Sequence, residues 1–277
     1  MTNPVGSDST FAGSIPALYD RHLGPLLFAP YARELGERLA ALRSGALLET
    51  AAGSGIVTEV LVETLPAAVE IVATDLNQAM VDHAAAKPSL ARATLRQADA
   101  LALPFEAARF DAVVCQFGAM FFPDRVAGYC EARRVLKPDG RFVFAMWDSL
   151  DHNPMTHCVV DAMARHFPAN PPRFLARTPH GHFDRDAIRR ELAEAGFGSV
   201  ELEVVTLPSR AASPRGPAIG FCQGTPMRGE IEALAPGAAG LQAATDAAAI
   251  ALAAAFGAGP IEAPMQALVI VARSGRN

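Results

Sequence analysis

Short apolar runs and helical patterns alternate along the first half of the chain. The apolar runs predict strands at 46–49, 69–74, 94–98, 110–116 and 141–146. Between them, helical spacing predicts helices at 56–64, 77–86 and 124–136, and Pro66 and Pro88 follow the first two as stop signals. Strands that alternate with helices in this way indicate βαβ units, so the sequence predicts an α/β fold with a mainly parallel sheet.

Further elements flank this region on both sides. Upstream, segments 15–23 and 30–42 have helical spacing, and Tyr31, Leu35 and Leu39 share one apolar stripe of the second. Residues 137–140, with the sequence KPDG, predict a tight turn before the strand at 141–146. Downstream, the pattern predicts a helix at 184–195 and strands at 199–205 and 265–272.

Two segments, at about 148–183 and 208–262, lack the strand pattern. The first is rich in Pro, His and Gly, and the second contains an Ala-rich stretch at 241–256 that predicts a helix. We expect both to be helical insertions over the carboxyl-terminal edge of the sheet, where ligands bind in open α/β folds.

Composition narrows the class of protein. The 277 residues are 51% hydrophobic and 19% charged, with a formal net charge of −5, which suits a well-packed globular chain. No run of basic residues exceeds two, so we expect no nucleic-acid partner. The four scattered cysteines, the polar start of the chain and the lack of an apolar run of about 20 residues predict a cytoplasmic protein without integral membrane association.

The candidate chemistry lies at the ends of four predicted strands, which a parallel sheet brings to one crevice. Gly53 and Gly55 follow the first strand and let the backbone approach a ligand closely. Asp75 ends the second strand, where a carboxylate can accept hydrogen bonds from ribose hydroxyls. Asp99 and the Ala100 amide, after the third strand, suit the edge of adenine, and Met80 and Leu101 are candidates for its faces.

A dinucleotide is the alternative ligand for such a glycine turn. Its fingerprint needs a third glycine for close packing of helix on strand, and Thr58 stands at that position. Glu49, just before the turn, would repel a pyrophosphate but suits an ammonium group. Both departures favour a ligand with a cationic amino acid and no phosphate, which describes S-adenosylmethionine.

A resemblance supports this interpretation. The runs LLETAAGSG, ATDLNQAM, QADALALPFEAARFDAVVCQFGAMFFPD and EARRVLKPDGRFVF, within residues 45–148, resemble class I S-adenosylmethionine-dependent methyltransferases. Among these they are most similar to the ubiquinone/menaquinone biosynthesis C-methyltransferase group. The resemblance implies a Rossmann-like, doubly wound, seven-stranded sheet whose last strand, at 265–272, is antiparallel. It also implies a methyltransferase domain at 45–277 that carries the two insertions as an acceptor cap.

The resemblance also implies roles for single residues. It assigns Glu49, Ala51, Gly53 and Gly55 to the methionine moiety, Asp75 and Leu76 to the ribose, Asp99 and Ala100 to the adenine, and Gln116 and Phe117 to the surroundings of the sulfonium. Many relatives carry Gly-Cys or Ala-Cys where this chain has Ala51-Ala52, and all of these residues are small. Tyr19 resembles the aromatic residue of an N-terminal lid, which we expect at 1–44.

No catalytic base stands out. Five histidines lie at 148–183, and His180 and His182 are spaced two apart, but two ligands do not make a metal site and we expect none. His152, His157 and His180, together with Tyr19, are weak candidates for the base. Methyl transfer depends chiefly on positioning, so the lack of a triad does not argue against an enzyme.

The sequence therefore predicts methyl transfer to a small organic acceptor that is quinone-like, aromatic or a natural-product intermediate. An NAD(P)-dependent oxidoreductase and a non-catalytic cofactor-binding regulator are the alternatives. A homodimer stays open as the assembly.

Overall fold

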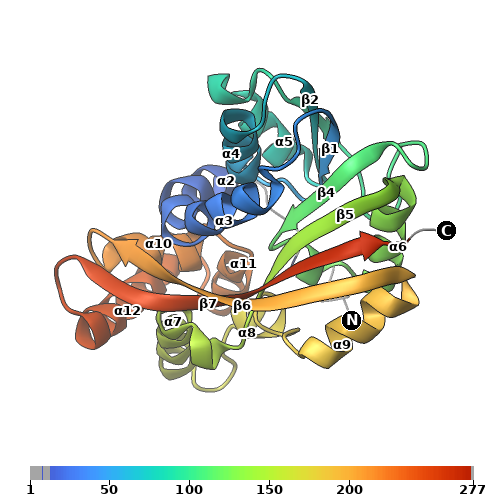
Figure 1. The fold of residues 1–277 in the computed structure, drawn as a ribbon. Helices are drawn as coiled ribbons and strands as arrows, with labels where there is room; N and C mark the ends of the chain where they lie inside the picture. Colours follow the sequence, from blue (N-terminus) through green and yellow to red (C-terminus); the bar gives the residue numbers. More distant parts are fainter. Residues whose placement is uncertain (1–7, 9–12, 276–277) are drawn as a thin grey trace. The chain divides into compact units, whose positions relative to one another are not determined.

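The computed structural model describes Asp8 and residues 13–275, and their chain forms two compact units (Figure 1). One, here called the sheet unit, contains residues 31–147 and 183–205 and the described residues from 267 onward. The other, the helical unit, contains the described residues up to 30, together with 148–182 and 206–266. The predicted lid at 1–44 is thus divided between the units, and its residues 1–7 and 9–12 lie outside the described part.

A seven-stranded sheet forms the centre of the sheet unit, in the order β3-β2-β1-β4-β5-β7-β6. The strands are β1 (Gly45–Glu49), β2 (Val69–Asp75), β3 (Thr94–Gln97), β4 (Phe110–Gln116), β5 (Leu136–Trp147), β6 (Phe197–Ala211) and β7 (Ile261–Ser274). The pairs that join β3, β2, β1, β4 and β5 are parallel, and β7 pairs with β5 in the antiparallel direction. This confirms the predicted α/β sheet with an antiparallel last strand.

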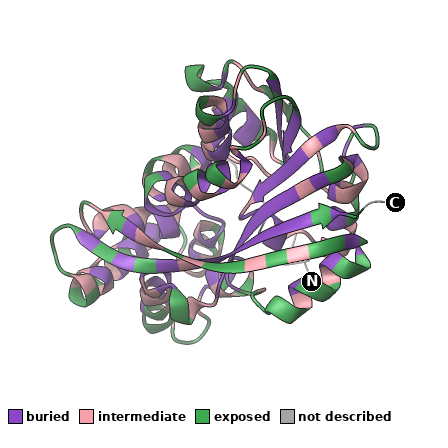
Figure 2. Ribbon diagram, viewed as in Figure 1, coloured by how far each residue is buried: buried purple, intermediate pink, exposed green. Residues whose placement is uncertain are grey.

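Helices of the sheet unit follow the predicted positions. They are α3 (Ala29–Leu39), α4 (Ile56–Thr64), α5 (Gln78–Ala85), α6 (Arg125–Val135) and α9 (Arg185–Glu194), with short 3₁₀ turns η2 (Pro88–Leu90) and η3 (Ala119–Phe121). The stripe Tyr31, Leu35 and Leu39 on α3 is wholly buried, as its helical spacing predicts. The strands β1, β4 and β5 are mostly buried (Figure 2) because helices flank a parallel sheet.

The predicted turn at 137–140 is wrong in detail. β5 begins before it, at Leu136, which pairs with Phe110, and the register then shifts so that Arg141 pairs with Ala112. Residues 137–140 therefore form an irregularity inside the strand, with Asp139 in the left-handed region at φ +64°. The Lys137 ammonium donates to the Asp111 carboxylate at 2.8 Å and ties this irregularity to β4.

The helical unit contains α2 (Ile15–Leu18), η1 (Tyr19–Phe28), η4 (Leu150–His152), α7 (Pro154–His166), α8 (Phe174–Arg177), α10 (Arg215–Gln223), α11 (Met227–Leu234) and α12 (Ala238–Phe256). The two segments predicted as insertions are thus rich in helix. The α-helix predicted at 15–23 is wrong beyond residue 18, since η1 is a π-helix with Pro25 inside it. Proline has no N–H to donate, so a regular α-helical hydrogen bond is lost there.

Helix α12 is the one helix of the described residues that is long and apolar enough to cross a membrane, by length and composition only. Its apolar window has a mean hydropathy of 1.4 and is 28% buried. It packs against α7 and α10 within the helical unit. The expected cytoplasmic location stays a prediction.

Candidate functional site

The sheet brings the predicted site residues of β1, β2, β3 and β4 to one edge. Glu49 pairs with Ala73 and Val114, and Asp75 pairs with Gln97, so these strand ends are immediate neighbours. All four strands run in the same direction, and the loops that follow them therefore leave the sheet on the same side.

The loop after β1 folds back onto β2. The Ala52 N–H donates to the Thr74 carbonyl at 2.9 Å, and the Gly53 N–H donates to the Asp75 carboxylate at 2.8 Å. Three of its residues have positive φ: Ala51 at +52°, Gly53 at +57° and Gly55 at +83°. A left-handed backbone is easy for glycine and strained for alanine, so Ala51 holds a conformation that its side chain disfavours.

Gly53 and Gly55 differ in what a side chain would meet at each position. A Cβ at Gly53 would meet nothing within 4 Å, which leaves open space beside the backbone. A Cβ at Gly55 would lie 2.6 Å from the Leu90 side chain. The close approach at Gly55 is therefore to η2 of the same protein, and its contact with a ligand stays a prediction.

Glu49 is the most deeply buried acid of the site, with 1% of its surface exposed. Thr58 Oγ1, in the first turn of α4, donates to Glu49 Oε2 at 2.6 Å. Burial raises the pKa of Glu49 to about 8, the nearby Asp75 charge adds to the rise, and the Thr58 hydrogen bond opposes it. Thr58, which stands where the dinucleotide fingerprint has a glycine, thus has a polar partner inside the site, and no pattern along the chain indicated this contact.

Asp75 is also buried, and both of its oxygens accept backbone hydrogen bonds. Oδ2 accepts from Gly53 N and Oδ1 from Asn77 N, each at 2.8 Å. Burial raises the pKa of Asp75, and these hydrogen bonds oppose the rise. The next residue, Leu76, is 50% exposed. Asp75 therefore joins the loop after β1 to the loop after β2 and leaves Leu76 at the surface.

The residues proposed for adenine differ in exposure. Asp99 is exposed, and its Oδ1 accepts from Leu101 N at 2.9 Å in a turn. Ala100 and Leu101 are half-buried. Met80 is almost completely buried on α5, so its side chain belongs mainly to the packing of that helix, and its contact with a purine stays a prediction.

An aromatic cluster lies at the end of β4 and β5. Phe117, which follows Gln116, has φ +51° and stacks on Trp147 with ring centroids 3.8 Å apart. Tyr31 meets both rings edge-on, at 5.2 and 5.5 Å, and its hydroxyl donates to the Val205 carbonyl at 2.8 Å. The sequence indicated only that Tyr31 is apolar core; the side chains are too far apart along the chain for a pattern to join them.

The weak base candidates lie in the helical unit. Tyr19 stacks on Phe28 with centroids 4.6 Å apart, and His152 is exposed. His157 lies 3.8 Å from the carboxylates of both Asp151 and Asp161.

His180 is buried, with Nδ1 2.7 Å from a backbone carbonyl, that of Asp148. Because a carbonyl only accepts, Nδ1 carries a hydrogen. Burial lowers the pKa of His180 to about 4, so the ring is neutral near pH 7 and its described contact is structural. Among the described residues, no group of three or more His, Cys, Asp and Glu side chains is arranged to hold a metal ion.

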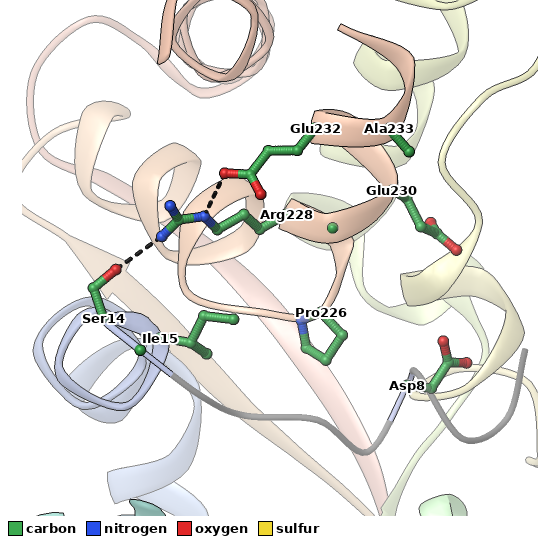
Figure 3. A pocket seen from close by; sticks show the side chains of 10 residues that line it. Asp8, Ser14, Ile15, Pro226, Arg228, Glu230, Glu232 and Ala233 are labelled. Atoms are coloured by element: carbon green, nitrogen blue, oxygen red, sulfur yellow. Dashed lines mark hydrogen bonds and ion pairs between the residues drawn. The ribbon is translucent and has the colours of Figure 1, made fainter. Parts of the chain in front are cut away.

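The helical unit contains a cavity of about 690 Å³ beside α2 and α11 (Figure 3). Arg228 donates to Ser14 and to Glu232, each at 2.8 Å. Glu230 accepts from Arg177 at 2.8 Å, and Arg177 also pairs with Asp8. These charged groups are bonded to one another, and they join the described start of the chain to α8 and α11.

Comparison with known proteins agrees with the resemblance to methyltransferases. Residues 48–144 match the family model described as "Methyltransferase domain". The chain is 41% identical over 99 residues to the demethylmenaquinone methyltransferase of Deinococcus radiodurans, a match that covers 35% of this chain and 41% of the relative. It is 36% identical over 103 residues to the ubiquinone/menaquinone biosynthesis C-methyltransferase UbiE of Geotalea uraniireducens, covering 36% and 44%.

A solved structure extends the likeness beyond this region. The phosphoethanolamine N-methyltransferase 2 of Haemonchus contortus, in complex with S-adenosyl-L-methionine, superposes with a TM-score of 0.58 at 15% identity, covering 94% of this chain and 57% of that one. This likeness concerns the fold. The chain spans less than half the length of the two curated relatives. The resemblance to class I methyltransferases of the ubiquinone/menaquinone group is confirmed for the region that carries the strand-end residues.

Proposed function

We propose that this protein binds S-adenosylmethionine at the strand ends of the sheet unit and transfers its methyl group to a small organic acceptor. The observation that carries this proposal is the pair of buried carboxylates at neighbouring strand ends, Glu49 and Asp75, on either side of the open backbone at Gly53.

The residues fit the parts of this cofactor. Glu49 would bind the ammonium of the amino-acid tail, because a buried carboxylate gains most from a cation. Asp75 would accept from the ribose through Oδ2, which has a further lone pair beside the Gly53 N–H, whereas Oδ1 already accepts from both the backbone N–H and the side-chain amide of Asn77. The exposed Asp99, with the Ala100 amide, would bind the adenine edge.

The dinucleotide alternative fits less well. A pyrophosphate beside Glu49 and Asp75 would add negative charge to two buried acids whose pKa values are already raised. Thr58 occupies the place where the dinucleotide fingerprint needs glycine, and its side chain binds Glu49. The charge of the site therefore favours a cationic ligand over a phosphorylated one.

The bound cofactor supplies an electrophilic methyl group on a sulfonium, which needs an acceptor in line and no metal. The chain's own residues bind and orient. The stacked rings of Phe117 and Trp147 close the end of β4 with apolar surface, beside Gln116. Positioning of this kind supplies up to roughly 7–11 kcal/mol of a displacement barrier in favourable models.

For the acceptor we propose a quinone-like, aromatic or related natural-product ring. The demethylmenaquinone and ubiquinone/menaquinone methyltransferases among the relatives support this class. The helical segments 148–182 and 206–266, which replace the βα pattern, are the proposed source of acceptor selectivity. If the acceptor must lose a proton, His152 and His157 are the exposed or half-buried candidates for the base.

Calorimetric titration of the purified chain with S-adenosylmethionine and with NAD tests the cofactor. We expect binding of the first and none of the second. A screen of quinols, phenols and other aromatic acceptors with a methyl-labelled cofactor then tests the reaction. Tight NAD binding would favour the oxidoreductase alternative, and cofactor binding without any labelled product would favour a non-catalytic regulator.

A further inference from the structure

We infer that Thr58 is a positioning residue that holds the Glu49 carboxylate for the cofactor ammonium, and that cofactor binding releases one proton from Glu49 to solvent. This inference rests on the proposed function. It begins from the 2.6 Å hydrogen bond between Thr58 Oγ1 and Glu49 Oε2, in which both side chains are buried.

The position of the pair is set by two elements. Glu49 ends β1, and Thr58 lies in the first turn of α4, whose preceding residue Gly55 has φ +83°. The Thr74 hydroxyl also contacts Glu49, but it donates to the backbone carbonyl at 3.0 Å and not to the carboxylate. Two buried threonines thus donate hydrogen bonds to Glu49, but only Thr58 donates to its carboxylate, the group that would bind a cation.

The surroundings determine the charge of Glu49 in the ligand-free protein. The ionisable groups that interact with it are Asp75, on β2, and Cys115, on β4, while Thr58 from α4 is neutral. Burial and Asp75 both favour the neutral acid, and the pKa of Glu49 is raised to about 8. Near pH 7 the site therefore holds the proton on Glu49 in most molecules.

An ammonium ion needs the carboxylate form as its partner. Binding therefore converts the neutral Glu49 acid and a free ammonium into an ion pair, and the Glu49 proton leaves to the buffer. Thr58 stabilises the carboxylate by donating to it, so it lowers the work of removing that proton. The cofactor's affinity should consequently rise with pH up to about 8.

Proton release is measured by calorimetry of S-adenosylmethionine binding at pH 7 in two buffers with different ionisation enthalpies. We expect the wild-type protein to release close to one proton more than the Glu49→Gln variant. This variant is the reference because it lacks the Glu49 proton, while the cofactor's own amino group, which titrates near pH 8, is mostly protonated at pH 7 and contributes little in either protein. Wild-type binding without this difference would overturn the inference.

Thr58 is tested by the dependence of the dissociation constant on pH. Thr58→Val keeps the branched shape and removes the hydroxyl; we expect the rise of its affinity to shift to higher pH and its affinity at pH 7 to fall about tenfold. Thr58→Ser should stay within about threefold of wild type. Thr74→Val, the matched control, should keep the wild-type pH profile.

The outcomes distinguish a failure of the proposed function from a failure of the proposed role of Thr58. If the wild-type protein binds no S-adenosylmethionine, the proposed function fails. If it binds and the Thr58→Val profile superimposes on the wild-type one, the role of Thr58 is refuted while the function stands. Circular dichroism checks the fold of each variant, and Thr58→Ala replaces Thr58→Val if the larger side chain prevents folding.

Discussion

Replacing Glu49 with glutamine should remove a pH-dependent loss of stability from the ligand-free protein. The ordinary pKa of this side chain, 4.5, rises to about 8 in the folded chain because the carboxyl group is buried beside Asp75. Between these values the folded state holds a proton that the unfolded chain has released. Glutamine has nearly the same shape and stays neutral throughout, so it carries no such penalty.

The sign and size follow from linkage. A raised folded pKa means that the stability contribution is fully present below pH 4.5 and is lost as the pH rises through about 8. The loss is about 1.4 kcal/mol per pH unit, or on the order of 5 kcal/mol over the whole interval. Asp75 acts in the same direction, but it is present in both proteins and cancels in the comparison.

The assay is urea unfolding of the ligand-free wild-type and Glu49→Gln proteins at pH 5, 6, 7 and 8. The free energy of unfolding of the variant, relative to that of the wild type, should increase with each rise in pH. Asp111→Asn is the control: burial raises the pKa of Asp111, but hydrogen bonds from Lys137 and the Ala46 amide outweigh it and lower the pKa below its ordinary value of 3.8. Its stabilisation is lost only below that pH, so the difference between Asp111→Asn and the wild type should stay constant from pH 5 to 8. Parallel curves for wild type and Glu49→Gln would refute the reasoning.

Three further predictions concern the same edge of the sheet. Ala51→Gly, at φ +52°, should raise the free energy of unfolding by about 0.5–1 kcal/mol in urea titrations, because glycine relieves the left-handed strain. Gly55→Ala should lower it by roughly 2–3 kcal/mol, because the new Cβ lies against Leu90 as well as at positive φ, whereas Gly53→Ala should cost only about 1 kcal/mol in the same assay. Asp99→Asn should weaken S-adenosylmethionine binding about tenfold by calorimetry and leave thermal unfolding unchanged, because Asp99 is exposed and asparagine can keep the turn to the next amides.

The sheet and its site edge could be predicted because they depend on periodicity and topology. Apolar runs separated by helical patterns specify parallel pairing, and parallel pairing by itself brings Glu49, Asp75 and the end of β4 together. The residues of α4 and β4 were predicted with the bounds that the structure has. No knowledge of side-chain contacts was needed for these steps.

What the sequence did not reveal depends on packing in three dimensions. The bond from Thr58 to Glu49 requires the turn between them to bring α4 back over β1, which composition does not encode. The stacking of Phe117 on Trp147 joins the ends of two strands, and Phe117 reaches it through a left-handed backbone that no pattern marks. The π-helical turn around Pro25 likewise replaces a helix that spacing alone predicted to be regular.

The buried acids also give a physical reason to expect that the ligand-free site distinguishes ligands by charge. Glu49 and Asp75 are each hydrogen-bonded, yet burial still raises both pKa values, so their hydrogen bonds do not offset the loss of water. A cation placed beside them favours their charged form, whereas a phosphate would raise both pKa values further. We therefore expect the energy that the folded chain gives up to keep two carboxyl groups buried to be recovered with a positively charged ligand and not with a phosphorylated one.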